Sequence, residues 1–373
     1  IIDKIWIENL NPQSEINIYD FDADYIAINA INRLPEKNKI NNWKYIRNSL
    51  NIKPIHFNFL KDYQSPERTQ IFYNPTANYN LYDGISIGSK FYDKGILTQK
   101  FTFELMPQYS AVNKNLVGKI NLSYLIHDEN SKNYATLITF GGSSYHYDKN
   151  LRYEVFTPGV SFFFRTNDFR LNAGHRIGLY YYNINREKSI ESNTNPNYEL
   201  INLRYIYSNK GALKHTTLES NIQFEENFTK FDLEFDFRRM FKSGRQFTLR
   251  LFFGKFLYHN FKQTNFFDFN LNRPQDYLFK YNYFGRSENQ GFYSQQIIMA
   301  EGGFKSMHQN STSNDYILSA NITHGLWNWI EAFTDIGVLK NDKIKASTYF
   351  GSGIRFNIIP DYFELFFPII SSN

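Results

Sequence analysis

The sequence predicts an all-β fold, a transmembrane antiparallel β-barrel of roughly 16 strands, within a range of about 14–16. Three observations predict this fold class. The chain combines an aromatic fraction of 18% with a mean hydropathy of −0.51, which is an unusual pairing for a soluble core. Long segments alternate apolar and polar side chains, and residues typical of turns separate these segments.

The composition excludes several other classes of protein. Lys and Arg number 41 against 36 Asp and Glu over 373 residues, a net charge of +5 that is too mild for a dedicated nucleic-acid binder. The absence of Cys excludes disulfide scaffolds, thiolate zinc sites and Cys nucleophiles. A helical membrane protein needs a run of about 18 apolar residues, and the sequence contains none. The many aromatic residues argue against a disordered chain.

The clearest alternation runs through residues 231–238, where every second side chain is apolar. Successive side chains of a strand point to opposite faces, so one set should face lipid and the other the lumen. The expected lipid-facing residues are Phe231, Leu233, Phe235 and Phe237. The expected lumen-facing charges are Arg204, Asp232, Glu234, Asp236, Arg238 and Arg250. These charges would either set ion selectivity in a pore or pair across strands and help to fill the interior, and we favour the pairing.

The connections between strands support the same architecture. Short polar connections with hairpin-turn chemistry lie at Thr166–Asp168, Ser208–Gly211, Lys242–Arg245 and Asn341–Lys343. Longer connections lie at Asn183–Asn197 and His259–Asn289. Outer-membrane barrels carry short turns at one rim and long loops at the other, and we expect the same segregation here.

A soluble β-sandwich also alternates apolar and polar residues and is the main alternative fold. Sandwich strands are typically about 5–6 residues long, whereas a tilted membrane-crossing strand needs about 9–11. The segments here reach the longer length, and aromatic clusters at Tyr145–Tyr147 and Tyr180–Tyr182 are typical of interface girdles. Because every backbone group in lipid must be paired, we expect the sheet to close.

A change of pattern divides the chain into two parts. Residues 1–50 hold two short β-like segments, Lys4–Ile7 and Tyr25–Ala30, and then an Asn- and Lys-rich linker. We expect this part to be the end of an upstream periplasmic β-rich domain, and residues 51–373 to form the barrel. The chain opens without Met and stops directly after an apolar strand, so we expect it to be part of a longer polypeptide.

The sequence contains no recognisable catalytic or metal-binding motif. None of the eight His residues forms His-Glu-x-x-His, the pattern that grips zinc in metalloproteases. Asp20, Asp22 and Asp24 resemble the start of a calcium loop, but Tyr25 stands where that loop needs Gly. Gly-x-Ser-x-Gly, the P-loop and the dinucleotide fingerprint are also absent. We therefore assign no catalytic residue and no metal ligand to this chain.

Several short stretches resemble the C-terminal half of the gluzincin-type (aminopeptidase-like) metallopeptidases of Bacteroidota outer membranes. The resemblance covers most of residues 25–370. It rests on Leu34–Glu36, Asn41–Asn42, Ser65–Gln70, Tyr79–Gly84, Asp276–Phe279, Phe284–Ser287, Ser294–Gln296 and Pro360–Pro368. It implies a periplasmic peptidase-like region upstream of the barrel. The zinc ligands of that family would precede Ile1, so zinc is implied as a cofactor of the upstream region and not of this chain.

Three functions follow as hypotheses for a chain placed in the cell outer membrane of a Gram-negative bacterium. The first is a barrel that anchors the upstream peptidase-like domain and docks into a larger outer-membrane complex. The second is a porin-like transport pore with a charged lumen. The third is a membrane-tethered zinc metallopeptidase whose catalytic residues lie outside this chain, so whether the protein is an enzyme stays open. The expected partners are outer-membrane lipid and other outer-membrane or periplasmic proteins, with no nucleic acid.

Overall fold

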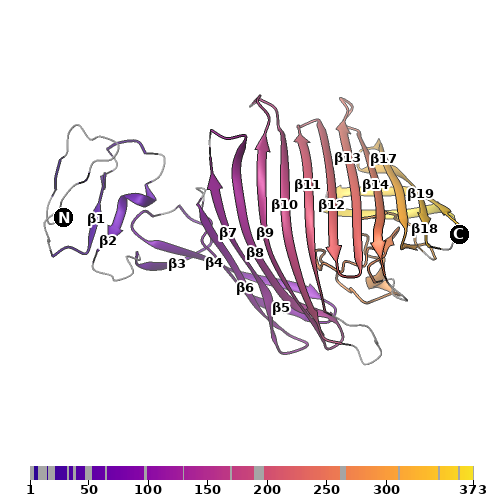
Figure 1. Cartoon of the computed structure of the whole chain (residues 1–373), viewed down its shortest axis with the longest axis horizontal. Helices are drawn as coiled ribbons and strands as arrows, with labels where there is room; N and C mark the ends of the chain where they lie inside the picture. The colour runs from indigo at the N-terminus through magenta and orange to yellow at the C-terminus, as the bar shows by residue number, and fades with distance from the viewer. Residues whose placement is uncertain are drawn as a thin grey trace.

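A computed structural model gives the fold of the chain (Figure 1). It describes residues 4–6, 15, 22–31, 33–36, 39–46, 53–63, 65–95, 99–128, 130–168, 170–188, 197–260, 266–309, 311–342, 345–359 and 362–372. Among these residues, no helix has the length and apolar character needed to cross a membrane.

One large sheet of 16 strands dominates the described part of the chain. Its strands are β3 (Ile55–Phe59), β4 (Thr69–Asn80), β5 (Gly84–Tyr92), β6 (Phe101–Ser110), β7 (Leu116–His127), β8 (Asn133–Asp148), β9 (Leu151–Arg165), β10 (Ala173–Arg186), β11 (Tyr198–Lys210), β12 (Lys214–Glu225), β13 (Phe228–Met240), β14 (Gln246–His259), β17 (Tyr316–Trp327), β18 (Ile330–Lys340), β19 (Ser347–Ile359) and β20 (Phe363–Ser371). Neighbouring strands of the sheet follow one another in the chain, except that β15 and β16 lie between β14 and β17, and each described pair is antiparallel except β3 with β4. The predicted all-β fold class is confirmed.

The local sequence explains why these residues form strands. β13 alternates apolar and charged side chains, and its register sets Phe235 opposite Leu218 of β12 and Leu251 of β14. Apolar residues therefore line up across strands on one face. The turn between β8 and β9 uses Asn150 at φ 55°, a left-handed conformation that Asn tolerates. The turn between β13 and β14 uses Gly244 at φ 76°.

The strand directions define two rims. We call the rim where β4 begins the first rim and the opposite one the second rim. The longest connections, 187–197 and 260–315, both lie at the second rim, as the sequence predicts. The predicted confinement of short turns to the other rim is wrong, because the connection that contains Asn341 and the tight turn at Lys149–Asn150 also lie at the second rim. A short turn can close any adjacent antiparallel pair, so the long connections are additions to a rim that also carries hairpins.

The chain between β14 and β17 folds back onto the large sheet. We call residues 266–309 the inner segment. It contains β15 (Phe269–Asn270), which pairs with β16 (Thr312–Ser313), and the 3-10 helix η2 (Phe292–Gln295). Its side chains and backbone contact the turn after β4 and strands from β8 round to β19, so the sheet curls around it (Figure 1).

The core of the molecule lies between the inner segment and the sheet. We call the strands of the large sheet the wall. A single cluster of buried apolar residues joins wall residues such as Ile184, Leu200 and Phe228 to Phe269 and Leu271 of the inner segment. Two wall glycines allow this close approach. A Cβ at Gly254 would stand 2.5 Å from the Phe269 ring, and one at Gly337 would stand 2.9 Å from both Leu271 and Phe304. The wall is therefore shaped to the segment that it encloses.

A small two-stranded sheet precedes the large one. It pairs β1 (Tyr25–Ala27) with β2 (Trp43–Tyr45), and the 3-10 helix η1 (Ile40–Asn42) directly precedes β2. The predicted strand at Tyr25–Ala30 is thus shorter than expected. Residues 4–6 of the predicted segment Lys4–Ile7 are not a strand, and Ile7 lies outside the described residues. β3 adds a parallel strand beside the start of β4.

Candidate functional site

The candidate site is the set of contacts between the inner segment and the concave face of the large sheet. At its centre the ammonium group of Lys230, on β13, is almost fully buried. Its Nζ donates to the carbonyl oxygen of Phe267 at 2.8 Å, lies 3.9 Å from Glu301 Oε1 and lies 3.9 Å from the centroid of the Phe269 ring. A buried ammonium group needs such partners to offset its lost hydration.

Two further charged side chains attach the inner segment to the large sheet. Arg250 Nη1, from β14, donates to the carbonyl oxygen of Glu301 at 2.7 Å and to Asn321 Oδ1 at 3.0 Å. Lys305 Nζ pairs with Asp335 Oδ1 of β18 at 2.7 Å, and both side chains are at least 98% buried. The backbone N–H of Lys305 also donates to the other oxygen of Asp335, at 3.1 Å. A buried pair with added hydrogen bonds fixes geometry more than it adds stability.

The opposite wall holds the segment through aromatic and backbone contacts. The ring of Phe279 stacks on Tyr153 of β9 with centroids 4.0 Å apart. The hydroxyl of Ser287 donates to the carbonyl oxygen of Tyr147, and the backbone N–H of Ser287 donates to the hydroxyl of Tyr82, each at 2.7 Å. The segment thus contacts strands on both sides of the curled sheet.

An internal ion pair shapes the middle of the inner segment. Arg286 Nη1 lies 2.5 Å from Asp276 Oδ2, and the guanidinium also sits over the Phe279 ring at 4.8 Å from its centroid. Asp276 further accepts the backbone N–H groups of Lys280 and Tyr281 at 2.8 and 2.9 Å. These contacts let a non-repetitive stretch satisfy its own backbone groups away from water.

Burial changes the ionisation of the acidic residues in this segment. Burial raises the pKa of Glu301 to about 7, although Lys230 and the hydrogen bond from the backbone N–H of Asn270 oppose the rise. Burial likewise raises the pKa of Asp268 to about 6, and Lys230 opposes that rise. Burial raises the pKa of Asp276 despite the opposing effect of Arg286. Near neutral pH the packing of this segment is therefore coupled to proton binding.

The register places the six charges expected to face the lumen on the face that carries the inner segment. Arg250 contacts that segment directly and also pairs with Glu234. Side-chain alternation puts Asp232, Glu234, Asp236 and Arg238 on one face of β13. Asn221 of β12 lies opposite both Asp232 of β13 and Arg204 of β11, so Arg204 is on the same face of the sheet. Cross-strand partners occur at Arg204, which bonds Glu219 at 2.6 Å, and at Asp232, which accepts from Asn221 at 2.8 Å.

The four residues expected to face lipid lie on the opposite, convex face. This set is Phe231, Leu233, Phe235 and Phe237, which alternate with the charges along β13. Their neighbours on the same face include Leu251, Leu203 and Ile336, whose side chains are exposed. The convex face is thus apolar across several strands.

The aromatic clusters have a different role from the expected interface girdles. Tyr145, Tyr147 and Tyr180 pack against the buried core, and Tyr182 is part of it. The inference of girdles at these tyrosines is wrong, because they line the concave face beside the inner segment. A phenol suits this position, since its ring packs while its hydroxyl finds a partner, as Tyr147 does at the carbonyl oxygen of Glu187, 2.6 Å away.

Sequence reasoning identified a long connection here but missed the inner segment as a packed element. Its signal is a dense set of aromatic residues with Asp276, Arg286 and Glu301 in a stretch without strand alternation. A connection of this length without strands of its own is uncommon unless it is functional or disordered. Among the described residues no group of three His, Asp or Glu could hold a metal ion. Asp20 lies outside the described residues, so the calcium-loop resemblance has no structural counterpart to report.

Comparisons with known proteins show little similarity to this chain. No family model matches it, and no curated protein matches it either. The resemblance to gluzincin-type metallopeptidases therefore stays a prediction. A crystal structure of BamA from Haemophilus ducreyi, lacking POTRA domains 1–3, is similar over 81% of this chain and 67% of that chain, at 12% identity and a TM-score of 0.45. At that identity and TM-score we draw no conclusion from the similarity.

Proposed function

We propose that this chain is an outer-membrane β-barrel of a Gram-negative bacterium whose lumen is filled by its own inner segment, so that it serves as an anchor and not as a pore. The observation that carries the proposal is the packing of the inner segment against the concave face, with ion pairs to β13 and β18 and a hydrogen bond from Arg250 of β14. The apolar convex face supports placement in lipid, because a sheet with one apolar face and one polar, filled face suits a bilayer.

The anchored cargo is the part of the protein attached at the first rim. β3 begins beside Thr69, the first residue of β4, so residues 1–50 connect to the sheet at that rim. We propose that they end an upstream periplasmic peptidase-like domain and that residues 51–373 form the barrel. The first rim then faces the periplasm, the second rim faces outward, and the assembly docks to other outer-membrane or periplasmic proteins.

Planar-bilayer conductance tests the filled lumen. The wild-type protein should give no steady single-channel current. A variant in which a short Gly/Ser linker replaces residues 271–309 should give steady currents, because the linker cannot fill the space. Steady currents from the wild-type protein would overturn the anchor and favour the porin-like pore.

The upstream coding sequence tests the enzymatic alternative. An intact His-Glu-x-x-His with a downstream Glu would make the whole protein a membrane-tethered zinc metallopeptidase. A degenerate motif would leave the upstream region as a binding or assembly domain. In either case the barrel keeps its proposed anchoring role.

A further inference from the structure

A row of three polar side chains crosses β14, β17 and β18 near the second rim. The strand register sets Lys255 opposite Tyr316, and Tyr316 opposite Lys340. Each of the three has a neighbour along its strand that belongs to the buried core on the concave side, namely Phe256, Ile317 and Leu339. Because successive side chains of a strand point to opposite faces, Lys255, Tyr316 and Lys340 lie on the convex face.

One carboxylate holds the two ammonium groups of this row. Lys255 Nζ lies 2.9 Å from Asp315 Oδ1, and Lys340 Nζ lies 2.9 Å from Asp315 Oδ2. Both ammonium groups also lie over the Tyr316 ring, at 5.8 and 5.9 Å from its centroid. The Asp315 side chain is 14% exposed, whereas those of Lys255 and Lys340 are 43% and 41% exposed. An ammonium group has three N–H donors, so each lysine keeps donors for a ligand.

The row carries an excess of positive charge, because two lysines share one carboxylate. A second carboxylate, that of Asp342, lies two residues after Lys340, but its Oδ2 is 2.8 Å from His259 Nε2. The pair of ammonium groups therefore complements an anion that can accept hydrogen bonds from both of them.

The convex face is apolar between this row and the middle of the sheet. The next row on the same face is Phe253, Leu318 and Val338, and the row after it is Leu251, Ala320 and Ile336. In the membrane location proposed above the second rim faces outward. The lysine row then lies at the outer bilayer interface and the apolar rows lie in the hydrocarbon. The outward leaflet of a Gram-negative outer membrane is built of lipid A, whose phosphate groups lie at the interface above its acyl chains.

We propose that the row Lys255–Tyr316–Lys340 binds a phosphate group of one lipid A molecule, and this proposal rests on the proposed membrane location. The phosphate accepts hydrogen bonds from both ammonium groups, and the acyl chains lie over Leu318 and Val338. Asp315 is a positioning residue, because its two oxygens hold the lysines on either side of the Tyr316 ring.

Native mass spectrometry of the full chain, delipidated and in detergent, tests this site. The protein is titrated separately with lipid A, dephosphorylated lipid A and phosphatidylglycerol. We expect the wild type to bind one lipid A more tightly than either of the other two lipids. The double variant Lys255→Gln, Lys340→Gln should weaken lipid A binding about tenfold, because it removes both charge-assisted contacts. The double variant Lys255→Arg, Lys340→Arg keeps both charges and should retain the binding.

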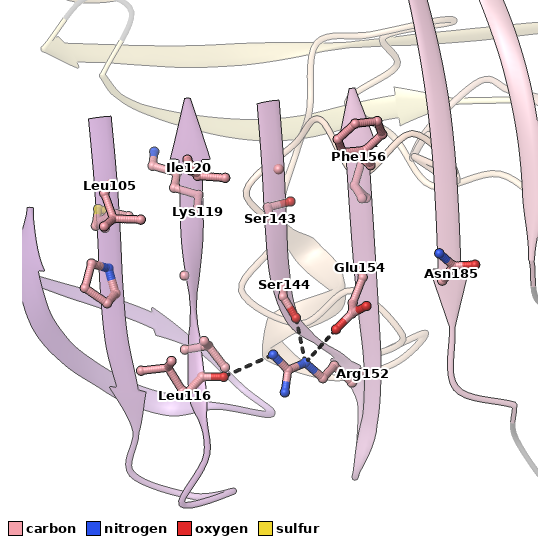
Figure 2. Close-up of a pocket in the computed structure, with 16 residues that line it drawn as sticks. Leu105, Leu116, Lys119, Ile120, Ser143, Ser144, Arg152, Glu154, Phe156 and Asn185 are labelled. Carbon is pink, nitrogen blue, oxygen red and sulfur yellow. Dashed lines mark hydrogen bonds and ion pairs between the residues drawn. The ribbon is translucent and has the colours of Figure 1, made fainter. Parts of the chain in front are cut away.

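Arg152 supplies a matched control, because it is the second residue of β9 and also lies near the second rim. It lines a pocket across β6–β10, where its Nε donates to Ser144 Oγ at 2.6 Å and its Nη2 donates to the carbonyl oxygen of Leu116 at 3.1 Å (Figure 2). Its Nε also lies 3.7 Å from Glu154 Oε1, so one carboxylate accompanies this one cation. Arg152→Gln should therefore leave lipid A binding unchanged. Heat-dependent migration on a denaturing gel checks that each variant still folds.

The outcomes distinguish failure of this site from failure of the membrane location. Equal lipid A binding by the wild type and the double glutamine variant would overturn the site while leaving the barrel intact, and so would an equal loss in Arg152→Gln. Equal binding of phosphatidylglycerol, with the same dependence on the two lysines, would overturn the assignment to lipid A. A protein that stays monodisperse without detergent would overturn the membrane location and the lipid site together.

Discussion

Single residues alternate between two environments along each wall strand. In β13, Glu234 points toward Arg250 and the inner segment, while Phe235 points to the apolar convex face beside Leu218 and Leu251. The alternation follows from strand geometry alone, because a period of two sends neighbours to opposite sides. Replacing an apolar residue of a wall strand by a charged one therefore changes the contacts on one face of the sheet and leaves the other face unchanged.

Phe235→Arg tests the convex face at this scale. Phe235 lies near the middle of β13, so an arginine there should cost about 2–4 kcal/mol of folding free energy in a membrane-refolding titration. Phe247→Arg is the matched control, since Phe247 is on the same face but is the second residue of β14. Near the interface the cost should fall to about 0–1 kcal/mol. Equal costs at the two depths would show that the convex face does not lie in lipid.

The inner segment is the element that decides what the sheet can do. It supplies Phe269, Leu271 and Phe304 to a core that the wall strands cannot complete alone. Its ionic contacts also couple its packing to protonation, chiefly at Glu301, which faces Lys230 and the more distant carboxylates of Asp232 and Asp276. An element held by both packing and titratable groups should loosen before the surrounding hairpins do.

The free energy that holds the inner segment against the sheet should become less favourable as pH rises from about 5 to about 8. Because burial raises the pKa of Glu301 to about 7, the folded state holds a proton that the unfolded state has released. Stability contributed by that proton is present at low pH and is lost as pH rises toward 7, by roughly 1–3 kcal/mol. Conductance in planar bilayers at graded urea concentrations measures this, and wild-type channels should open at lower urea at pH 8.

Glu301→Gln is the control for the pH effect. Glutamine keeps an oxygen that can accept the backbone N–H of Asn270, but it does not titrate. The difference in urea dependence between the two pH values should therefore shrink in this variant. An undiminished difference would assign the pH effect to other groups, of which Asp268 is the first to test.

At the scale of the whole molecule, the sheet has a defined direction and order. The hairpin series runs from β4 to β20, and both of these strands run from the first rim to the second. β3 covers the start of β4 by parallel pairing. A strand that runs from the second rim to the first would pair antiparallel with both β20 and β4, so the order of the sheet fits closure through such a strand.

Migration on a denaturing gel, with and without boiling, tests closure of the sheet. A closed barrel offers no edge from which detergent can unzip the hydrogen-bond ladder, so we expect a boiling-dependent shift. A version that lacks residues 1–50 should keep the shift, because β1 and β2 pair with each other and lie outside the large sheet. Identical migration before and after boiling would mean that the sheet remains open.

The sequence by itself determined the strands and their two faces, and tertiary structure decided what the concave face encloses. Alternation in segments such as 231–238 is a local property with a period of two, so Phe235 and Glu234 could be assigned to opposite faces from the sequence. The packing of residues 266–309 depends on contacts with distant strands, such as Lys305 with Asp335 and Phe279 with Tyr153. No periodicity encodes such pairings. The sequence therefore predicts membrane-interface positions for Tyr145 and Tyr182, whereas both side chains lie at the buried core.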